Sequence, residues 1–400
     1  MKQVGIIGQG YVGLALAIKI AKAGHKVFGF DTNKLLVKSL VDGHSHIEDI
    51  SSEELTVVMN SGFYTPIDDF NKLSSCQIIV IAVPTPLDDS GQPELKFVKS
   101  AVQIISSIFK KEILIINEST SFPGTLRNEI AEEIYKKSGI NHKYAAAPER
   151  IDPGNNKWSI ENTPRVISGL SEEATQEAVD FYLSFTKSVT KVSTPEVAEM
   201  AKLVENSFRQ VNIAFVNELS QITNRMGLDI DEVLDAADSK PYGFMRFKPG
   251  AGVGGHCIPI DPIYLNYSAR KIGQESKLIS LSDQINSNMP SYIVSRIKKD
   301  HGNNLTGRKI VVIGIAYKPN TSDTRESPSL KIIDLLRSEG ASVTWHDEIV
   351  KTLKSEKSEK IKSNEIAIIA TIHTGVEINE VIKIPYVFDC TNTIKNVNKL

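Results

Sequence analysis

Near its amino end the chain reads Val4-Gly5-Ile6-Ile7-Gly8-Gln9-Gly10-Tyr11-Val12-Gly13, a short apolar strand that leads into glycines spaced Gly-x-Gly-x-x-Gly. A helical pattern follows from about Val12 to Ala23, and a second strand at Lys26–Phe30 ends in Asp31. This order of strand, turn, helix and strand is the setting that the motif needs. Its glycines permit a tight turn, close approach of a pyrophosphate, and packing of helix on strand. The stretch therefore predicts a dinucleotide-binding turn in a Rossmann-like unit.

Asp31 indicates which dinucleotide binds. A carboxylate at the end of the second strand can accept hydrogen bonds from both hydroxyls of an adenosine ribose, and it would repel a 2′-phosphate. The sequence thus favours NAD over NADP, with the phosphates at the amino end of the helix. The alternative is a plain strand-turn-helix that happens to be rich in glycine.

Two further apolar runs, Gln77–Val83 and Ile113–Ile116, have the continuous hydrophobic pattern of parallel strands that are buried on both faces. Each run ends in a polar turn that contains proline, and ligands of doubly wound sheets lie outside the carboxyl ends of the strands. We therefore expect Thr85 and Thr120, which follow these runs, to contact NAD. The alternative is that both are ordinary turn residues.

A long helix is expected in the middle of the chain. Ser193-Thr194-Pro195-Glu196 is a strong helix start, and no glycine or proline follows until Gly227, which predicts a helix of about 30 residues. Such a helix would connect two lobes, and its exposed apolar face is a candidate dimer surface. On its polar side, Lys202, Asn206 and Arg209 are spaced to share one face. The alternative for that face is a merely solvated surface.

A second α/β pattern begins with the strand Lys309–Gly314, after a linker at His301–Asn304. This half has no Gly-x-Gly-x-x-Gly motif, so we expect it to bind a different ligand, and Lys318 and Arg325 would suit phosphates. The predicted fold class is α/β, with two Rossmann-like doubly wound parallel-sheet domains joined by the long central helix and a helical middle domain. The predicted domain boundaries are 1–193, 194–300 and 301–400.

The stretch Gly250–Pro262 contains four glycines, three of them in a second Gly-x-Gly-x-x-Gly pattern, and then Cys257 and Asp261. No strand leads into this pattern and Pro249 precedes it, so it fails as a dinucleotide motif. It predicts instead a shaped loop that lets another molecule approach the backbone and presents a nucleophilic thiol. The alternative is a buried cysteine that acts as a small apolar residue.

Composition limits the class of protein. The chain has 400 residues, 41% of them hydrophobic and 24% charged, with a net charge of -2, which is typical of a globular protein with several domains. This charge argues against a nucleic-acid or membrane partner. Three widely separated cysteines and no apolar run of membrane length predict a cytoplasmic protein. His44 and His46 resemble a metal pair but lack a third ligand at a suitable spacing, so no metal site is predicted.

Several motifs in the expected order identify the chain as resembling the UDP-glucose/GDP-mannose dehydrogenase family over essentially its whole length. They are Gly8-x-Gly10-Tyr11-Val12-Gly13, Glu118-Ser119-Thr120 with Pro123-Gly124-Thr125, Ala147-Pro148-Glu149-Arg150, Lys202-Leu203-x-x-Asn206, Gly252-x-Gly254-Gly255-His256-Cys257 with Asp261, Ala316-Tyr317-Lys318-Pro319, and Asp323-Thr324-Arg325-Glu326-Ser327. The sequence Gly254-Gly255-His256-Cys257 looks like the branch that oxidises N-acetylated sugars. The segments Pro148–Asn155 and Cys257–Pro262 are similar to the members that oxidise UDP-N-acetylglucosamine.

The resemblance implies oxidation of the C6 alcohol of a nucleotide sugar to a carboxylate, with two NAD+ and one water. In this chemistry Cys257 would form a thiohemiacetal and then a thioester, Lys202 and Asn206 would stabilise oxyanions, and Glu149 would be a general base. Asp261 would hold water or tune the thiol, and Thr120 would orient the water. The NAD site would comprise Gly8, Gly10, Tyr11, Val12, Gly13, Asp31, Thr85, Thr120 and Arg325.

The resemblance also implies a UDP-sugar site. It would comprise Glu149, Arg150, Ile151, Lys202, Asn206, Arg209, Gly254, Tyr317 and Lys318, with Arg246 as the arginine that reaches the substrate across a homodimer or higher homo-oligomer. UDP-N-acetylmannosamine and UDP-glucose remain alternative substrates. Two other functions also remain open: a two-electron dehydrogenase that does not use Cys257, and a catalytically silent nucleotide-binding module.

Overall fold

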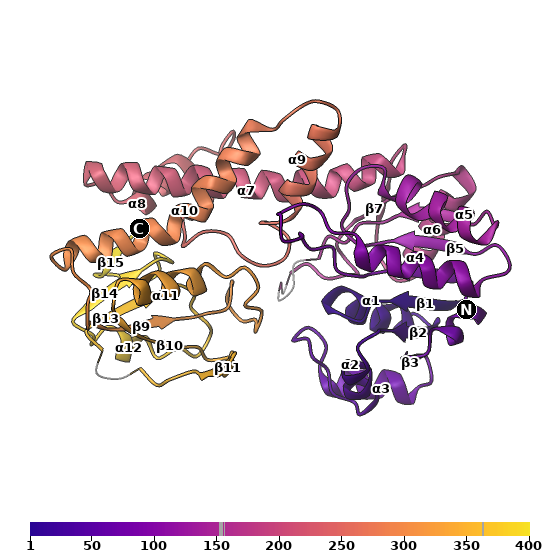
Figure 1. The fold of residues 1–400 in the computed structure, drawn as a ribbon, viewed down its shortest axis with the longest axis horizontal. Coiled ribbons are helices and arrows are strands. Elements are labelled where there is room, and N and C mark those ends of the chain that lie inside the picture. Colours follow the sequence, from indigo (N-terminus) through magenta and orange to yellow (C-terminus); the bar gives the residue numbers. More distant parts are fainter. Residues whose placement is uncertain (152–154, 156, 362–363) are drawn as a thin grey trace. The chain divides into compact units, whose positions relative to one another are not determined.

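The computed structural model describes every residue of the chain except 152–154, 156 and 362–363. It divides into two compact units (Figure 1). The first comprises Met1–Glu205 with Tyr267–Ile272, and the second comprises Asn206–Asn266 with Gly273–Leu400. Most of the turn expected at Asp152–Asn155 lies outside the described residues.

The first unit is built on an eight-stranded sheet in the order β3-β2-β1-β4-β5-β6-β7-β8. Its strands are β1 (Gln3–Ile7), β2 (Lys26–Phe30), β3 (Tyr64–Ile67), β4 (Ile78–Ile81), β5 (Leu114–Asn117), β6 (Lys143–Ala146), β7 (Arg165–Gly169) and β8 (Val189–Lys191). The order reverses between β1 and β4, which is where doubly wound sheets bind their ligands. All neighbouring strands run parallel except β6 and β7, which pair antiparallel. The predicted Rossmann-like parallel sheet is confirmed, with this one antiparallel pair.

Helices surround this sheet in the first unit (Figure 1). They are α1 (Tyr11–Lys22), α2 (Lys34–Val41), α3 (Ser52–Asn60), α4 (Lys96–Ile108), α5 (Glu132–Ser138) and α6 (Glu172–Leu183), with a 3-10 turn, η1 (Phe70–Ser75), and a π-helical turn, η2 (Thr125–Ala131). Side chains cap several of them at the amino end: Asn33 accepts from two backbone N–H groups of α2, and Ser171 accepts from Ala174 N at 3.1 Å. The apolar face of α1, including Leu14 and Ile18, is buried in the core with Val4 and Ile6 of β1.

The long central helix is confirmed as α7 (Pro195–Met226), 32 residues in length. It begins where the sequence predicted, with Thr194 Oγ1 accepting from Val197 N at 3.4 Å. It ends before Gly227, which adopts φ +72°, a conformation that favours glycine. The helices α8 (Ile230–Asp238), α9 (Asp261–Lys271) and α10 (Lys277–Asp300) follow it.

The second unit contains a five-stranded parallel sheet in the order β10-β9-β13-β14-β15. Its elements are β9 (Lys309–Ile313), α11 (Pro328–Ser338), β10 (Ser342–His346), β13 (Ile366–Ile369), α12 (Ile378–Val381), β14 (Tyr386–Asp389) and β15 (Asn398–Lys399), and a small hairpin pairs β11 (Thr352–Leu353) with β12 (Glu356–Lys357).

Alternate residues of β9 enter different cores of this unit. Val312 packs with Ile297 of α10 and Leu336 of α11, whereas Val311 packs with Val381 of α12. Both faces of the sheet are therefore covered by helices, as a second Rossmann-like domain requires. In the part of the chain that the structure describes, no helix is both long and apolar enough to cross a membrane.

Candidate active site

The glycine turn between β1 and α1 has the shape that its motif requires. Gly8 adopts φ +96° and donates its N–H to Phe30 O at 2.8 Å. A Cβ on Gly8 would stand 2.4 Å from Ala82 O, and one on Gly13 would stand 1.9 Å from Gly8 O, so neither position can carry a side chain. A Cβ on Gly10 would meet no atom within 4 Å, and Gly10 offers no side-chain cap to α1. This amino end of a helix suits an anion.

Asp31 reaches back over the same turn. Its carboxylate accepts from Gln9 N and from Asn33 N, both at 2.8 Å, and the residue is only partly buried. Behind the turn, the buried side chain of Gln9 donates to Gly8 O at 2.9 Å and accepts from Tyr64 Oη at 2.8 Å. The turn, the helix end and the carboxylate together fit NAD, and Tyr11 and Val12 begin the helix at that point.

Thr85 and Thr120, which were expected to contact NAD, lie on two loops that the side chain of Ser119 links by hydrogen bonds. Ser119 Oγ accepts from Val83 N at 2.9 Å and donates to Val83 O at 2.8 Å, which ties the loop after β5 to the loop after β4. Thr85 is buried and Thr120 is partly buried. Both loops follow the carboxyl ends of neighbouring strands in this sheet, as predicted.

Glu199 of α7 holds the segment that follows Thr120. Its carboxyl group accepts from Gly124 N at 2.7 Å and from Leu126 N at 2.9 Å, at the start of η2. Burial raises the pKa of Glu199 to about 7, although these N–H groups favour its charged form.

Glu149 belongs to a buried cluster of charged groups in the first unit. Its Oε2 lies 3.0 Å from Arg165 Nη1, an ion pair that is not aligned for a hydrogen bond, and its Oε1 accepts from Arg150 N and Ile151 N at 2.5 and 2.6 Å. Burial opposes the charge on Glu149, but Arg165, Glu118 and Lys202 outweigh it and place the pKa of Glu149 below its ordinary value. Glu149 is therefore held as a carboxylate, the form that a general base needs.

Two other predicted substrate residues, Lys202 and Arg150, lie near the Glu149 carboxylate. Lys202 is 8% exposed and lies close enough to Glu149 to favour its charge. The Arg150 side chain pairs with Glu205, Nη2 to Oε1 at 2.5 Å, and donates to Pro164 O at 2.7 Å. The first unit thus brings Glu149, Arg150, Ile151 and Lys202 together.

The second unit presents Cys257 as an exposed residue of an irregular loop, as predicted. Cys257 O accepts from Asp261 N at 2.9 Å, so the cysteine stands at the amino end of α9, a position that favours negative charge. Cys76 and Cys390 are buried core residues.

The glycines before the cysteine lie against the loop that follows β9. A Cβ on Gly254 would stand 2.8 Å from Tyr317 Cβ, and Gly255 N donates to Arg325 O at 2.9 Å. The second unit thus brings the cysteine loop together with Tyr317 and Arg325.

Asn206 and Asp261 form a direct pair in this unit. Asn206 Nδ2 donates to Asp261 Oδ2 at 2.5 Å, and both residues are buried. The imidazole next to the thiol is uncharged at neutral pH: burial, with the Arg325 charge, lowers the pKa of His256 to about 4. His256 therefore offers the cysteine no positive charge.

A buried pair supports the loop that carries Tyr317 and Lys318. Asp347, after β10, accepts from Ile315 N at 2.8 Å and from His373 Nε2 at 3.0 Å, while His373 Nδ1 accepts from Asn320 N at 2.8 Å. These bonds join the loops that follow β9, β10 and β13. Burial opposes the charge on Asp347, but these donors lower its pKa to about 2.

The structure describes the surroundings of two predicted arginines. Arg209 is exposed on α7, and Arg246 pairs with Asp231 at 3.1 Å and Asp235 at 2.8 Å, both on α8.

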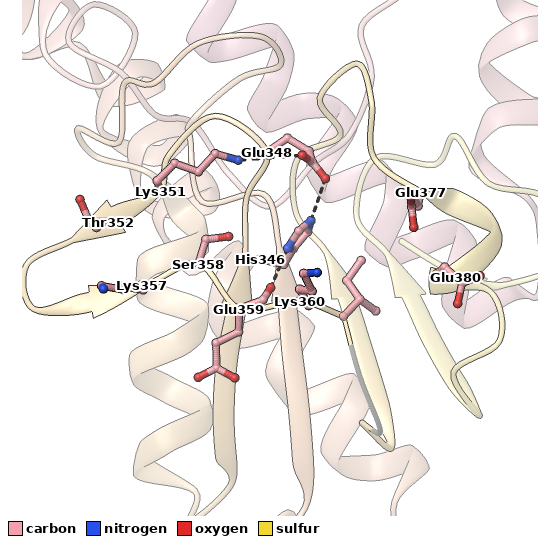
Figure 2. Close-up of a pocket in the computed structure, with 11 residues that line it drawn as sticks. His346, Glu348, Lys351, Thr352, Lys357, Ser358, Glu359, Lys360, Glu377 and Glu380 are labelled. Atoms are coloured by element: carbon pink, nitrogen blue, oxygen red, sulfur yellow. Dashed lines mark hydrogen bonds and ion pairs between the residues drawn. The ribbon is translucent and has the colours of Figure 1, made fainter.

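A cavity of about 730 Å³ at the carboxyl end of β10 is lined by none of the predicted residues (Figure 2). The lining contains both lysines and glutamates, so its charge favours no particular ligand. Within it, His346 Nε2 bonds to Glu348 Oε1 at 3.0 Å. Among the described residues no cluster of metal-ligating side chains occurs.

No sequence motif predicted a role for Arg165, Tyr182, Asp347 or His373, and Glu118 was named only as part of a family motif. The one local signal was a charged residue, Arg165, at the start of an otherwise apolar strand. The other signals are burial and pairing across many residues of sequence, which no short motif reveals.

The chain matches three domain models of the UDP-glucose/GDP-mannose dehydrogenase family. They are the NAD binding domain over residues 2–186, the central domain over 196–288 and the UDP binding domain over 311–396. The chain is 35% identical to UDP-N-acetyl-D-glucosamine 6-dehydrogenase of Pseudomonas aeruginosa, over 84% of this chain and 79% of that one. It is also 35% identical to UDP-N-acetyl-D-mannosamine dehydrogenase of Campylobacter jejuni, over 85% and 84%. The solved structure of the UDP-N-acetyl-D-mannosamine dehydrogenase of Pyrococcus horikoshii has a TM-score of 0.90 at 30% identity, covering 99% of this chain and 97% of that one.

Proposed function

The chain belongs to the UDP-glucose/GDP-mannose dehydrogenase family, and on that premise we propose that it oxidises the C6 hydroxyl of a UDP-N-acetylhexosamine to a carboxylate. UDP-N-acetylglucosamine is the favoured substrate, because the segment Cys257–Pro262 is similar to that branch of the family and a relative of that name is 35% identical. The N-acetylmannosamine epimer is the second candidate, supported by the relative of Campylobacter jejuni. NAD+ is the electron acceptor in both oxidation steps.

The observation that carries this proposal is the exposed Cys257 at the amino end of α9, on a loop whose glycines pack against Tyr317. The Cys257 thiolate adds to the C6 aldehyde carbon to form a thiohemiacetal. Oxidation of that adduct gives a thioester, and water then releases the carboxylic acid and restores the thiol. A two-electron alcohol dehydrogenase would not need this cysteine.

Other residues have supporting roles in the proposed mechanism. Lys202 and Asn206 donate to the oxygen anions that form at C6, and Asp261 fixes the amide of Asn206. Glu149 accepts a proton from the hydrolytic water, which Thr120 orients. We further propose that residues 1–193 hold the cofactor, 194–300 carry the cysteine and 301–400 bind UDP.

We propose that the protein is a cytoplasmic homodimer or higher homo-oligomer. On α7, Phe208, Phe215 and Ile222 recur every seven residues and are 48%, 52% and 43% exposed. Such a regular apolar stripe on one helix suits pairing with the same helix of a second copy. Light scattering would show twice the chain mass or more, and a monomer at micromolar concentration would contradict this part of the proposal.

The function is tested by counting NADH formed per sugar nucleotide consumed, with UDP-N-acetylglucosamine, UDP-N-acetylmannosamine and UDP-glucose in parallel. Two NADH and a uronic acid from UDP-N-acetylglucosamine are expected. One NADH would reject the thioester route, and activity only on another sugar would reject the substrate. Cys257→Ser should lose turnover to the acid, whereas the control Cys76→Ala, which changes a core cysteine, should retain it; full turnover by Cys257→Ser would favour the two-electron alternative.

A further inference from the structure

Two buried amide side chains of the second unit, those of Asn217 on α7 and Asn286 on α10, have no role in the proposed mechanism. The two residues are 0% and 1% exposed. A polar group in such a place is costly unless it is hydrogen-bonded, so the groups that these amides bond to indicate their role. The bonds lead to the cysteine loop, Gly250–Cys257.

The bonds run from the cysteine loop to the backbone of the long helix. Gly250 N donates to Asn217 Oδ1 at 2.8 Å, and Asn217 Nδ2 donates to Asn286 Oδ1 at 2.9 Å. Asn286 Nδ2 in turn donates to Gln210 O at 3.1 Å. The first group, a backbone N–H, can only donate and the last, a backbone carbonyl, can only accept, so each amide has one orientation that satisfies its neighbours. The start of the cysteine loop is thereby fixed to α7.

The middle of the loop packs on the backbone of the same asparagine, Asn286. Gly252 adopts φ +131°, and a Cβ on it would stand 2.8 Å from Asn286 O. Pro290 lies four residues further along α10 and has no N–H, so it cannot donate the bond that Asn286 O would receive in a regular helix. Asn286 therefore meets the loop with its backbone at Gly252 and, through Asn217, with its side chain at Gly250.

The cysteine loop has few side chains that could hold it in place. Its four glycines have nothing to pack and can adopt many backbone conformations, so the loop depends on restraints from its surroundings. Beyond Gly252, Gly255 N donates to Arg325 O at 2.9 Å. Cys257 follows two residues later as an exposed residue. The position of the thiol therefore depends on how well the loop is held.

We propose that Asn217 and Asn286 are positioning residues for Cys257: Asn217 holds the start of the cysteine loop through Gly250 N, and Asn286 orients the amide of Asn217. This inference rests on the proposed function, in which Cys257 is the nucleophile. Loss of either amide leaves every reacting group in the chain. It lets the loop depart from the geometry in which the thiol reaches the C6 carbon, and a small displacement of a reacting atom lowers a rate strongly.

The first experiment needs no substrate and measures hydrogen–deuterium exchange of the Gly250 N–H in the folded chain. Asn217→Leu keeps the approximate size of the side chain but removes the acceptor, so this N–H should exchange roughly tenfold faster than in the wild type. The control is Val381→Ala, which opens a cavity in the core around Val311 and should leave the rate unchanged. Equal rates in the wild type and Asn217→Leu would overturn the proposal, as would equal acceleration by Val381→Ala.

The second experiment is a double-mutant cycle on kcat, with Asn217→Leu, Asn286→Leu and both together. Each single variant should lower kcat by roughly tenfold while KM for the sugar nucleotide changes little, because the thiol is displaced but no binding group is removed. The double variant should be no slower than Asn217→Leu, since Asn286 acts through Asn217. Losses that multiply would overturn the role assigned to Asn286. A similar loss of kcat in Val381→Ala would attribute the effect to lower stability and reject positioning.

Failure of this inference and failure of the proposed function give different results. If the wild type forms no NADH from any UDP-sugar, the proposed function fails, while exchange at Gly250 still decides whether Asn217 holds the loop. If the wild type forms two NADH and Asn217→Leu retains full kcat, the function stands and the positioning role fails. Should Asn217→Leu not fold, Asn286→Leu serves for both measurements, because the unsupported amide of Asn217 should release the Gly250 N–H and lower kcat in the same way.

Discussion

The ring of Tyr317 occupies the space that a side chain on Gly255 would need: a Cβ there would stand 2.7 Å from Tyr317 Cε2. Gly255 also adopts φ +80° and donates its N–H to Arg325 O at 2.9 Å. The loop that presents Cys257 is thus fitted to the loop that is proposed to bind the sugar nucleotide, within one unit of the chain. A change at this contact would displace the thiol without removing any reacting group.

Gly255→Ala should therefore reduce kcat strongly while the chain still folds. The methyl group clashes with Tyr317, and a displacement of about 1 Å at a reacting atom can lower a rate by roughly a hundredfold. The control is Gly273→Ala, which has a similar φ of +74° but no atom within 4 Å of the added Cβ. Urea unfolding should show that both variants are destabilised by the same backbone strain. NADH formation should show that only Gly255→Ala loses activity. Equal activity of the two variants would contradict this account.

Asp31→Asn should weaken NAD binding and reduce the preference for NAD over NADP. The substitution removes the charge that repels a 2′-phosphate but keeps one oxygen for the backbone N–H groups of Gln9 or Asn33. The ratio of the two dissociation constants, measured by calorimetry, should shift by roughly tenfold or more. Asp42→Asn, at an exposed acid that ends α2, is the control and should leave the ratio unchanged. A preference that survives the loss of Asp31 would place the ribose elsewhere.

The sequence allowed prediction of those parts of the fold that depend on nearby residues. The bounds of β2 and the start of α7 agree with the predictions, because hydrophobic patterning and capping residues are local signals. The strand β3 was not predicted, since Pro66 interrupts its pattern, and proline is tolerated there because β3 lies at the sheet edge. The antiparallel pairing of β7 with β6 was not predicted.

The candidate site likewise has parts that local sequence predicts and parts that only the tertiary fold brings together. The glycine turn and the cysteine loop are contiguous in sequence, so their chemistry could be predicted from their spacing. The pair between Asn206 and Asp261 joins residues 55 positions apart, and that between Glu118 and Arg165 joins residues 47 apart. Such contacts arise from the tertiary fold alone.

His373→Ala should destabilise the second unit and weaken UDP binding. The substitution leaves the buried Asp347 without its imidazole partner and Asn320 N without an acceptor, at a cost of about 2–4 kcal/mol in the free energy of unfolding. The loop with Tyr317 and Lys318 loses one of its supports, so UDP should bind less tightly by calorimetry. His44→Ala, at an exposed histidine, is the control for both measurements. Unchanged UDP affinity in a destabilised His373→Ala chain would show that this pair stabilises the domain without positioning the loop.

His256→Gln should leave the reactivity of Cys257 toward iodoacetamide unchanged between pH 6 and 9. The imidazole is already uncharged in this range, because burial and Arg325 lower the pKa of His256 to about 4. The measurement is selective for Cys257 in the native chain, since Cys76 and Cys390 are buried and burial raises the pKa of both thiols, that of Cys76 to about 12.

Mass spectrometry of the alkylated peptides would give the rate at each pH for the wild type and the variant. A midpoint that moves up by about one pH unit in His256→Gln would show that an imidazolium stabilises the thiolate after all. An unchanged midpoint would leave the amino end of α9, where Cys257 O accepts from Asp261 N, as the feature that favours the anion. Cys257→Ser is the blank for the assay, because its native chain should take up no label.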